Sequence, residues 1–269
     1  MSKPNVDSGG KWPFVRNTPE RKLMANLVGL VEDLIIANRI LSVEGVVDAY
    51  GHVSARHPDD PNRFLLSRAR TPQCIEADDI MEFRLDGSAL DSRGRTAYLE
   101  RFIHAALYEA RADVNSVVHS HSRSVVPFSV AGESIRPIMH NCAPIGDAVP
   151  IWDSRDKFGD TDLLVSNMEM GRDLAHLIGH RPTALMRGHG SVASARSLRR
   201  AVYNAISLQT SADLQMQASR FDKTTFLSPG EIRQVMKMFD DTDDKPLAGM
   251  DRAWEYWCHR AGMPFKPLT

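Results

Sequence analysis

Apolar residues recur at helical spacing near the start of the chain. Thr18, Pro19 and Glu20 supply a capping hydroxyl, a proline at the first helical position and an acid in the first turn. The stripe that follows consists of Leu23, Leu27, Leu30, Val31, Leu34 and Ile35. This pattern predicts an amphipathic helix with one buried face.

Three more segments show the same period. Residues 96–108 place Leu99, Phe102, Ile103, Ala106 and Leu107 on one helical face, and residues 170–178 form a shorter helix. Ser197 is a helix cap, and the long stripe after it contains Leu198, Val202, Ala205, Ile206, Leu208, Ala212 and Met216. All three segments are therefore predicted helices.

Short β-branched and alternating runs predict strands between these helices. Residues 53–56 and 63–67 fit a hairpin, and residues 80–85 and 88–90 fit a second one around Asp86-Gly87. Further strands are expected at the run ending in His119 and at residues 183–186 and 191–193, while residues 123–165 read as a strand and loops. Helices and strands together predict a layered α/β (α+β) protein.

The chain divides into three parts by composition. Residues 1–16 are rich in Gly, Pro, Ser and Lys and predict a flexible arm, and residues 17–222 carry the helices and strands described above. Residues 223–269 predict a helical extension, with a helix at 231–239, an acidic linker and an aromatic helix containing Trp254, Tyr256 and Trp257. We expect this extension to pack on the core or on a neighbouring subunit.

The charge balance excludes several classes of partner. With 33 basic and 34 acidic residues, the chain has no electrostatic footprint for nucleic acid or an anionic membrane. It contains no run of 18 apolar residues and no signal-peptide core, so we expect no membrane span. Its three scattered cysteines, Cys74, Cys142 and Cys258, predict reduced thiols in a cytoplasmic protein.

The clearest chemical signal lies in residues 115–122, a β-branched run that ends in His119 and His121. In an extended backbone residues i and i+2 point to the same side, so both imidazoles can converge on one metal ion. The alternative is that the two histidines bind no metal and each forms hydrogen bonds with a separate core or surface partner.

Two other segments favour the metal interpretation. Glu100 lies nineteen residues before His119, within the helix predicted at residues 96–108. His189 lies between Gly188 and Gly190, which permit a sharp turn and a close approach. Three histidines and one carboxylate form a plausible ligand set for zinc, manganese or another divalent transition ion.

With these motifs the chain resembles the class II aldolase/adducin family. The matching segments are Gly51-His-Val-Ser54, Glu100 followed by His104, Val118-His-Ser-His121 and Arg187-Gly-His-Gly190, over roughly residues 20 to 220. The resemblance implies a three-layer fold with a central, mainly antiparallel sheet flanked by helices. It also implies three metal-binding histidines (His119, His121 and His189) and a glutamate, Glu100, that acts as a base and can touch the metal.

The same resemblance implies a homotetramer with sites near its subunit interfaces. It therefore favours packing of the C-terminal extension on a neighbouring subunit. The alternative is functional, with Tyr256 or His259 reaching into the site of that neighbour.

Departures from the family pattern concern the phosphate site of its sugar-phosphate aldolases. His52 replaces an asparagine, and Ala97-Tyr-Leu99 replaces two serines before the glutamate. The expected substrate-binding residues are His52, Ser54, Arg68, Arg70 and Thr71, of which His52, Arg68 and Arg70 are expected to supply cationic donors. Arginines pair with carboxylates in a bidentate way, although both arginines also fit ordinary surface charges.

This pattern resembles the decarboxylase branch of the family. It implies a metal-dependent carbon–carbon lyase that decarboxylates a hydroxypyridine or hydroxyphthalate type of dicarboxylate. The metal, Mn²⁺ or Zn²⁺, would stabilise an enolate, and Glu100 would move a proton. Burial would raise the pKa of Glu100 and a cation would lower it, which the sequence leaves open.

Two alternatives share the motifs. An aldolase acting on a non-phosphorylated hydroxy-keto acid would use every metal residue named above. A non-catalytic interaction module, as in the adducins, would be expected to lack metal ligands, all of which are present in this chain.

Overall fold

The computed structural model describes residues 19–240 and 248–267. The predicted arm and most of the acidic linker lie outside this range. The elements are α1 (Pro19–Val43), β1 (His52–Arg56), β2 (Arg63–Ser67), η1 (Pro72–Cys74), η2 (Ala77–Asp79), β3 (Ile80–Arg84), α2 (Arg101–Ala110), β4 (Ser116–Ser120), α3 (Val126–Ala131), η3 (His140–Ile145), β5 (Ile151–Trp152), α4 (Arg155–Phe158), α5 (Met168–Ile178), β6 (Thr183–Met186), β7 (Gly190–Ala195), α6 (Leu198–Ala218), α7 (Pro229–Asp240) and α8 (Ala248–Ala261).

Seven strands of the described chain form one sheet in the order β3-β2-β1-β4-β7-β6-β5. Every neighbouring pair is antiparallel except β5 and β6, which are parallel. The hairpin predicted around residues 57–62 forms, with Ala55 opposite Leu65. The prediction of a mainly antiparallel central sheet is confirmed.

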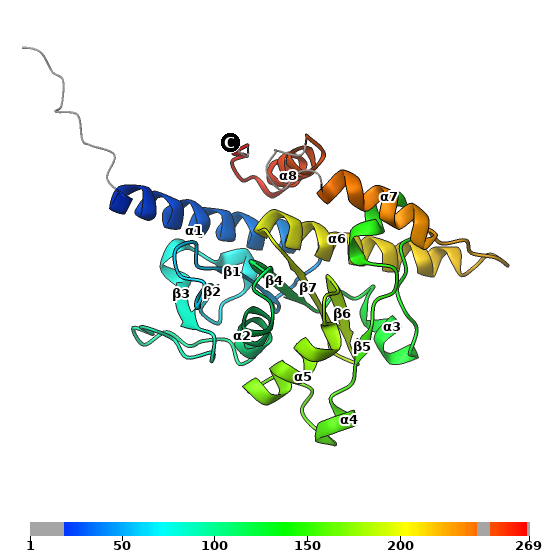
Figure 1. Cartoon of the computed structure of the whole chain (residues 1–269), viewed down its shortest axis with the longest axis horizontal. Helices are drawn as coiled ribbons and strands as arrows, with labels where there is room; N and C mark the ends of the chain where they lie inside the picture. The colour runs from blue at the N-terminus through cyan, green and yellow to red at the C-terminus, as the bar shows by residue number, and fades with distance from the viewer. Residues whose placement is uncertain (1–18, 241–247, 268–269) are drawn as a thin grey trace, which may run out of the picture.

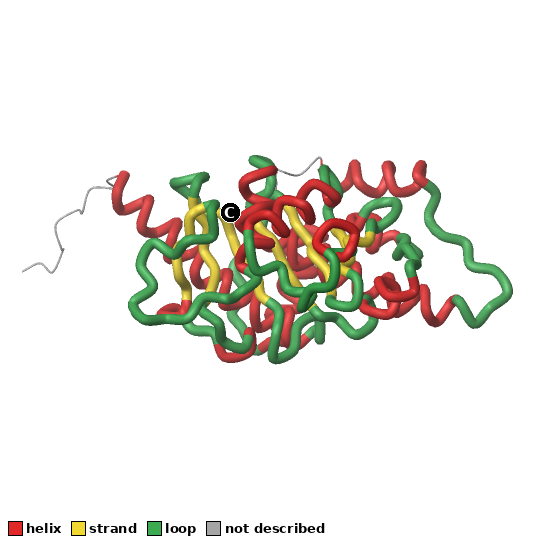
Figure 2. The backbone as a smooth tube through the Cα atoms, turned by 90° about the horizontal axis from the view of Figure 1, so that it is seen from below, coloured by secondary structure: helices red, strands yellow, loops and turns green. Residues whose placement is uncertain are grey.

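Helices cover both faces of this sheet (Figures 1 and 2). Successive strand residues point to opposite faces. Leu65 and Val118 therefore pack with α1, α6 and α8, whereas Phe64 and Val117 pack with α2 and α5. The result is the three-layer arrangement that the sequence predicted. Within the described range, no helix is both long and apolar enough to cross a bilayer.

The aromatic helix α8 packs on the core of its own chain. Trp254 and Trp257 retain 1% and 8% of their accessible surface and join the cluster formed by α1 and α6. Tyr256 is 57% exposed on the same helix, and His259 is also exposed. Contact of this outer face with a neighbouring subunit stays a prediction, as do the predicted domain boundaries.

The helix predicted at residues 96–108 begins later than expected, at Arg101. The preceding segment is extended, because Ala97 pairs with Arg68 in an isolated bridge and the Ala69 amide donates to the Thr96 carbonyl. Leu99, assigned to the buried stripe, is 62% exposed. Glu100 is consequently the N-cap residue of α2 rather than part of its first turns.

Two smaller predictions differ from the structure. Residues 88–90 turn back along the outer edge of β3, where the Arg84 amide donates to the Ser88 carbonyl and the Leu90 amide to the Glu82 carbonyl, but they form one isolated bridge, between Phe83 and Ala89, rather than a strand. Residues 123–165 contain the helices α3 and α4 and the 3-10 segment η3 in addition to the short strand β5. The two helices have six and four residues, which is too short for a long apolar stripe, so periodicity did not reveal them.

Close packing of α5 on α2 depends on Gly171. A Cβ at this position would lie 2.5 Å from the Phe102 carbonyl oxygen and 2.9 Å from the Ala106 Cβ. Since Glu100 caps α2, this contact also fixes the helix end that carries the candidate ligand.

We expect Gly171→Ala to lower the free energy of unfolding by about 1–3 kcal/mol, because the added methyl group overpacks the α2–α5 contact. Urea denaturation measures the change. Gly29→Ala in α1 is the matched control, since its added Cβ would meet no atom within 4 Å; it should be neutral or stabilising. Equal effects of the two substitutions would contradict this account of the packing.

Candidate metal centre

Four side chains from distant parts of the chain meet beside β4. The possible ligand atoms of Glu100, His119, His121 and His189 all lie within 4.8 Å of one another. The Nε2 atom of His121 lies 3.0 Å from that of His119 and 2.9 Å from that of His189. Glu100 Oε2 lies 3.3 Å from Nε2 of both His119 and His189. The structure thus brings together the whole ligand set expected from the sequence.

The sheet positions the three imidazoles. His119 is in β4, and His121 follows the end of that strand on the same side, as the extended backbone predicted. β7 pairs with β4, with Ser191 opposite Ser120, so the turn between β6 and β7 brings His189 to this strand end. Glu100 reaches the same place from the N-terminus of α2.

The glycines on either side of His189 have different roles. Gly188 adopts a φ of +66°, which glycine tolerates better than other residues. At Gly190 a Cβ would lie 2.0 Å from the Ser120 carbonyl oxygen and 3.0 Å from the His121 ring. Gly188 therefore permits the turn, and Gly190 permits the close approach of β7 to β4 beside His121.

Backbone carbonyls set the tautomers of two of the histidines. His119 Nδ1 lies 3.1 Å from the Ser191 oxygen, and His189 Nδ1 lies 2.8 Å from the Leu163 oxygen. A carbonyl only accepts, so each Nδ1 carries a proton, and each Nε2, which faces Glu100 and His121, can hold either a metal ion or a second proton that it donates to Glu100. Such carbonyl contacts are typical of metal-binding histidines. A divalent cation fits this arrangement because it satisfies acceptors that otherwise face one another.

The segment around Leu163 and Val165, which hydrogen-bonds to two of the candidate ligands, was not predicted from the sequence. Leu163, whose carbonyl accepts from His189, has a φ of +67°, and the Val165 amide donates to Glu100 Oε1 at 3.1 Å. Both contacts are made by main-chain atoms. Because they do not depend on side-chain type, the residue pattern carried no signal for them.

The electrostatics favour an ionised carboxylate. Burial alone raises the pKa of Glu100, but the charges and hydrogen bonds of His119 and His189 outweigh it and hold that pKa well below its usual range. Burial lowers the pKa of His189, and the hydrogen bond and charge of Glu100 raise it above the ordinary value. A proton therefore competes with a metal ion for the His189 nitrogen.

Burial, together with the two neighbouring imidazoles, lowers the pKa of His121 to about 4. This histidine is therefore neutral at pH 7. A neutral imidazole is the form that binds a metal ion, so His121 is available as a ligand without losing a proton.

His52 and Ser54 lie on the same side of the sheet as His119. The His52 ring is 5.0 Å from the His119 ring, between centroids, and 4.5 Å from the Tyr98 ring. Burial and the neighbouring His104 and His119 lower the pKa of His52, so His52 differs from the cationic donor expected of it. Ser54 is completely buried and contacts His104 and Tyr108, so it lies behind His52.

The two candidate arginines are held together by Asp79. Arg68 Nε and Arg70 Nη1 lie 2.5 Å and 2.6 Å from its two carboxylate oxygens. Their side chains remain 37% and 30% exposed, and Thr71 is half-buried beside them. Tyr98 links this segment to His52, because its hydroxyl donates to the Arg70 carbonyl oxygen.

Comparison with known proteins identifies the family. The family described as Class II Aldolase and Adducin N-terminal domain matches residues 32–216. The chain belongs to the class II aldolase and adducin family. The resemblance first found in four short motifs therefore extends over most of the chain.

Relatives within the family include decarboxylases. The chain is 34% identical over 251 residues to decarboxylase tropJ of Talaromyces stipitatus, covering 84% of this chain and 92% of that protein. It is 34% identical over 206 residues to the 3,4-dihydroxyphthalate decarboxylase of Arthrobacter keyseri, covering 71% and 79%. These relatives place the chain among the lyases of the family.

A solved structure supports the fold. An L-fuculose 1-phosphate aldolase from Glaciozyma antarctica matches with a TM-score of 0.71 at 20% identity, covering 98% of this chain and 97% of that one. The class II aldolase fold predicted from the sequence is confirmed.

We expect His121→Ala or His189→Ala to lower the metal content of the purified protein at least about tenfold, because each removes one of the converging nitrogens. Elemental analysis by plasma mass spectrometry measures the ratio of metal to chain. His176→Ala, on the exposed face of α5, is the matched control and should keep the content of the unaltered protein. Equal metal contents in the three variants would refute this assignment of ligands.

Proposed function

We propose that this lyase is a metal-dependent decarboxylase of a hydroxy-aromatic dicarboxylate, of the hydroxyphthalate or hydroxypyridine type. One observation carries the proposal. A chain 34% identical to a 3,4-dihydroxyphthalate decarboxylase places three imidazole nitrogens and a carboxylate around one point.

Glu100, His119, His121 and His189 would hold the ion, Mn²⁺ or Zn²⁺. A divalent cation at this point supplies a Lewis acid beside a substrate oxygen, which draws electrons from a neighbouring carbon–carbon bond. The protein has to hold the substrate so that the carboxylate to be lost and its ortho hydroxyl face these four side chains.

The proton steps are assigned to Glu100. Its ionised carboxylate, or a water that it positions, takes the proton of the ring hydroxyl and passes it to the ring carbon bearing the carboxylate. Carbon dioxide then leaves, and the electrons of the broken bond restore the aromatic ring as a phenolate. A proton from solvent completes the product, so that overall one carboxylate is replaced by hydrogen.

The second carboxylate of the substrate is assigned to Arg68 and Arg70. Asp79 binds Nε of Arg68 and Nη1 of Arg70, and the remaining amino groups of both side chains have no partner among the described residues. Those groups can meet a carboxylate in a fork-shaped pair. Thr71, the next residue along the chain, could add a hydroxyl contact.

A second candidate is an aldolase acting on a non-phosphorylated hydroxy-keto acid. The structural similarity to an L-fuculose 1-phosphate aldolase favours it, because retro-aldol cleavage poses the same problem of accepting electrons from a broken carbon–carbon bond. It would use the same four metal-binding residues.

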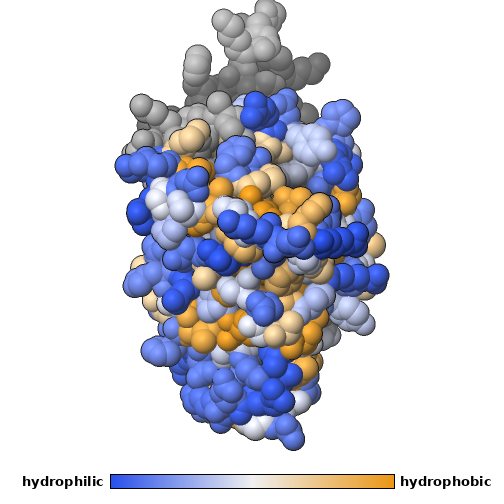
Figure 3. Space-filling view, turned by 90° about the vertical axis from the view of Figure 1, so that its right-hand side faces the viewer, coloured by the Kyte–Doolittle hydropathy of each residue, from blue (hydrophilic) through white to orange (hydrophobic). Residues whose placement is uncertain are grey.

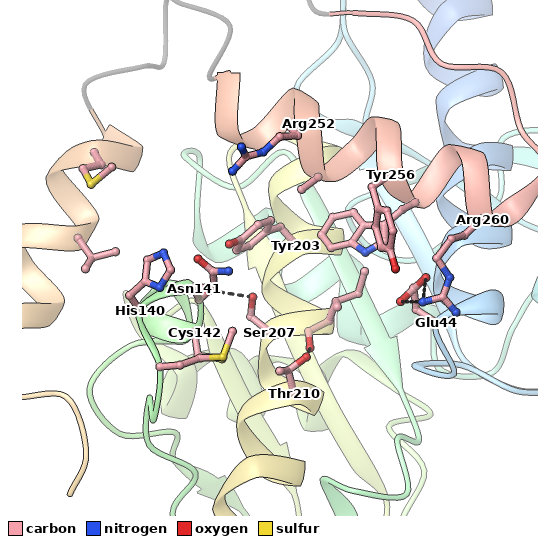
Figure 4. Close-up of a pocket in the computed structure, with 16 residues that line it drawn as sticks. Glu44, His140, Asn141, Cys142, Tyr203, Ser207, Thr210, Arg252, Tyr256 and Arg260 are labelled. Carbon is pink, nitrogen blue, oxygen red and sulfur yellow. Dashed lines mark hydrogen bonds and ion pairs between the residues drawn. The ribbon is translucent and has the colours of Figure 1, made fainter.

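We also propose a cytoplasmic homotetramer. Its three cysteines are all unpaired, as expected in a reducing compartment. Hydrophobic patches interrupt the surface at the end formed by α3 and α7 (Figure 3). Val130 in α3 is 60% exposed, and Met238 in α7 is 68% exposed. A cavity of about 700 Å³ lies between η3, α6, α7 and α8, with Tyr256 at its rim (Figure 4). These surfaces are candidates for subunit contacts.

We expect carbon dioxide release from 3,4-dihydroxyphthalate or a hydroxypyridine dicarboxylate, lost on chelation and restored by Mn²⁺ or Zn²⁺. Glu100→Gln should lower kcat at least about a hundredfold, the usual contribution of a positioned acid–base group. Glu133→Gln, at an exposed position, is the control. Mass spectrometry of the products separates the candidates, since pyruvate or an aldehyde without carbon dioxide would favour the aldolase and contradict the decarboxylase.

A further inference from the structure

Behind the candidate metal centre, four buried side chains form one line of hydrogen bonds. His52 Nδ1 lies 2.6 Å from His104 Nε2, and His104 Nδ1 lies 2.6 Å from Ser54 Oγ. Ser54 Oγ in turn lies 2.7 Å from the Tyr108 hydroxyl. His104, Ser54 and Tyr108 are at most 1% exposed, so these contacts are shielded from bulk water.

Tyr108, at the end of this line that lies away from the metal centre, determines which atom donates in each of its hydrogen bonds. In the described part of the chain, the Tyr108 hydroxyl has one hydrogen-bond partner, Ser54 Oγ. The phenol proton must then go to Ser54, its one acceptor among the described residues. The reverse direction would leave a buried phenol proton without an acceptor, which is costly.

The donor in each remaining hydrogen bond, from Ser54 to His52, follows from this first step. Ser54, which accepts from Tyr108, donates its own proton to His104 Nδ1. His104 is neutral, because burial lowers its pKa to about 3, so its ring proton lies on Nε2 and is donated to His52 Nδ1. His52 accepts at Nδ1, so a neutral His52 carries its own proton on Nε2.

His52 Nε2 has no hydrogen-bond partner in the described part of the chain, although the His52 side chain is buried, with 3% of its surface accessible. The His52 ring lies within 5.0 Å, between centroids, of the rings of Tyr98, His104 and His119. We propose that His52 is a neutral substrate-binding residue that donates one hydrogen bond, from Nε2, to a carboxylate oxygen of the substrate. His104, Ser54 and Tyr108 are positioning residues that hold His52 in this tautomer.

This inference rests on the proposed function for the identity of the ligand, but not for the direction of the protons. Because the tautomer is fixed, His52 Nε2 can donate a hydrogen bond but cannot accept one. This favours a carboxylate, which only accepts, over a hydroxyl or an amine at this position. It also differs from a cationic histidine, because the contact with His104 requires a lone pair on Nδ1. The residue that replaces the phosphate-binding asparagine of the sugar-phosphate aldolases thus becomes a directed donor.

Neutron diffraction from deuterium-exchanged, Zn²⁺-loaded protein tests the direction without any turnover. We expect deuterium on Nε2 of His52, on Nε2 of His104 and on the Ser54 hydroxyl pointing to His104. Deuterium on Nδ1 of His52, alone or together with Nε2, would overturn the inference. This outcome does not depend on whether the enzyme is a decarboxylase.

Binding of phthalate, a non-reactive dicarboxylate, tests the role of His52 by titration calorimetry of the Zn²⁺-loaded protein. The glutamine amide can replace Nε2 of histidine, whereas the asparagine amide replaces Nδ1. His52→Gln should therefore bind within about threefold of the unaltered protein, and His52→Asn about tenfold or more weakly, the loss of one hydrogen bond to a charged group. Equal affinities of the two variants would contradict the proposed donor.

The positioning role has its own variant. Tyr108→Phe keeps the ring and removes the proton that sets the direction, so Ser54 and His104 can reverse. We expect phthalate affinity to fall about threefold to tenfold, with deuterium now found on His52 Nδ1. Deuterium that stays on His52 Nε2 in this variant would refute the role of Tyr108. If phthalate fails to bind even the unaltered protein, the proposed substrate class is contradicted, and the neutron map still decides the tautomer.

Discussion

The site depends on acceptor atoms that are held face to face. Ser191 and Leu163 take the Nδ1 protons of His119 and His189, which leaves lone pairs on nitrogens 3.3 Å from the Glu100 carboxylate. Lone pairs at such separations repel unless a cation or a proton lies between them. The fold supplies the constraint that keeps them there, because two antiparallel strands and the end of one helix fix all four ligands.

The helices on both faces of the sheet support the elements that carry the four candidate ligands. On one face, Gly171 lets α5 pack closely against Phe102 and Ala106 of α2, the helix that Glu100 caps. On the other face, α1, α6 and α8 bury the strand residues that alternate with the site residues. The side chains nearest the metal candidates therefore rest on regular elements, and the segment around Leu163 completes the site with main-chain atoms.

Much of this could be predicted from the sequence because it depends on local periodicity. The extended run before His119 fixes two ligands on one side, the glycines beside His189 mark a turn and a close approach, and Ser197 caps α6 as expected. The position of Glu100 was predicted only in part. Pairing of residues 96–97 with the Arg68 and Ala69 backbone, a tertiary contact, overrides the helical pattern there.

The contacts that depend on strand register could not be read from the chain. His52 lies opposite His119 because β1 pairs with β4 in one particular register, and His104 reaches His52 across more than fifty residues. A polar residue at His104, on the apolar face of a predicted helix one turn after Glu100, was the available signal. The shared partner of Arg68 and Arg70, Asp79, had no such signal.

X-ray absorption spectroscopy of the purified protein tests the central claim most directly, because it reports the atoms around the ion itself. We predict one divalent metal with three imidazole nitrogens at about 2.0–2.2 Å and an oxygen ligand at a similar distance. A spectrum with sulfur ligands, with oxygen ligands alone, or with fewer than three imidazoles would contradict the assignment of Glu100, His119, His121 and His189 as one metal site.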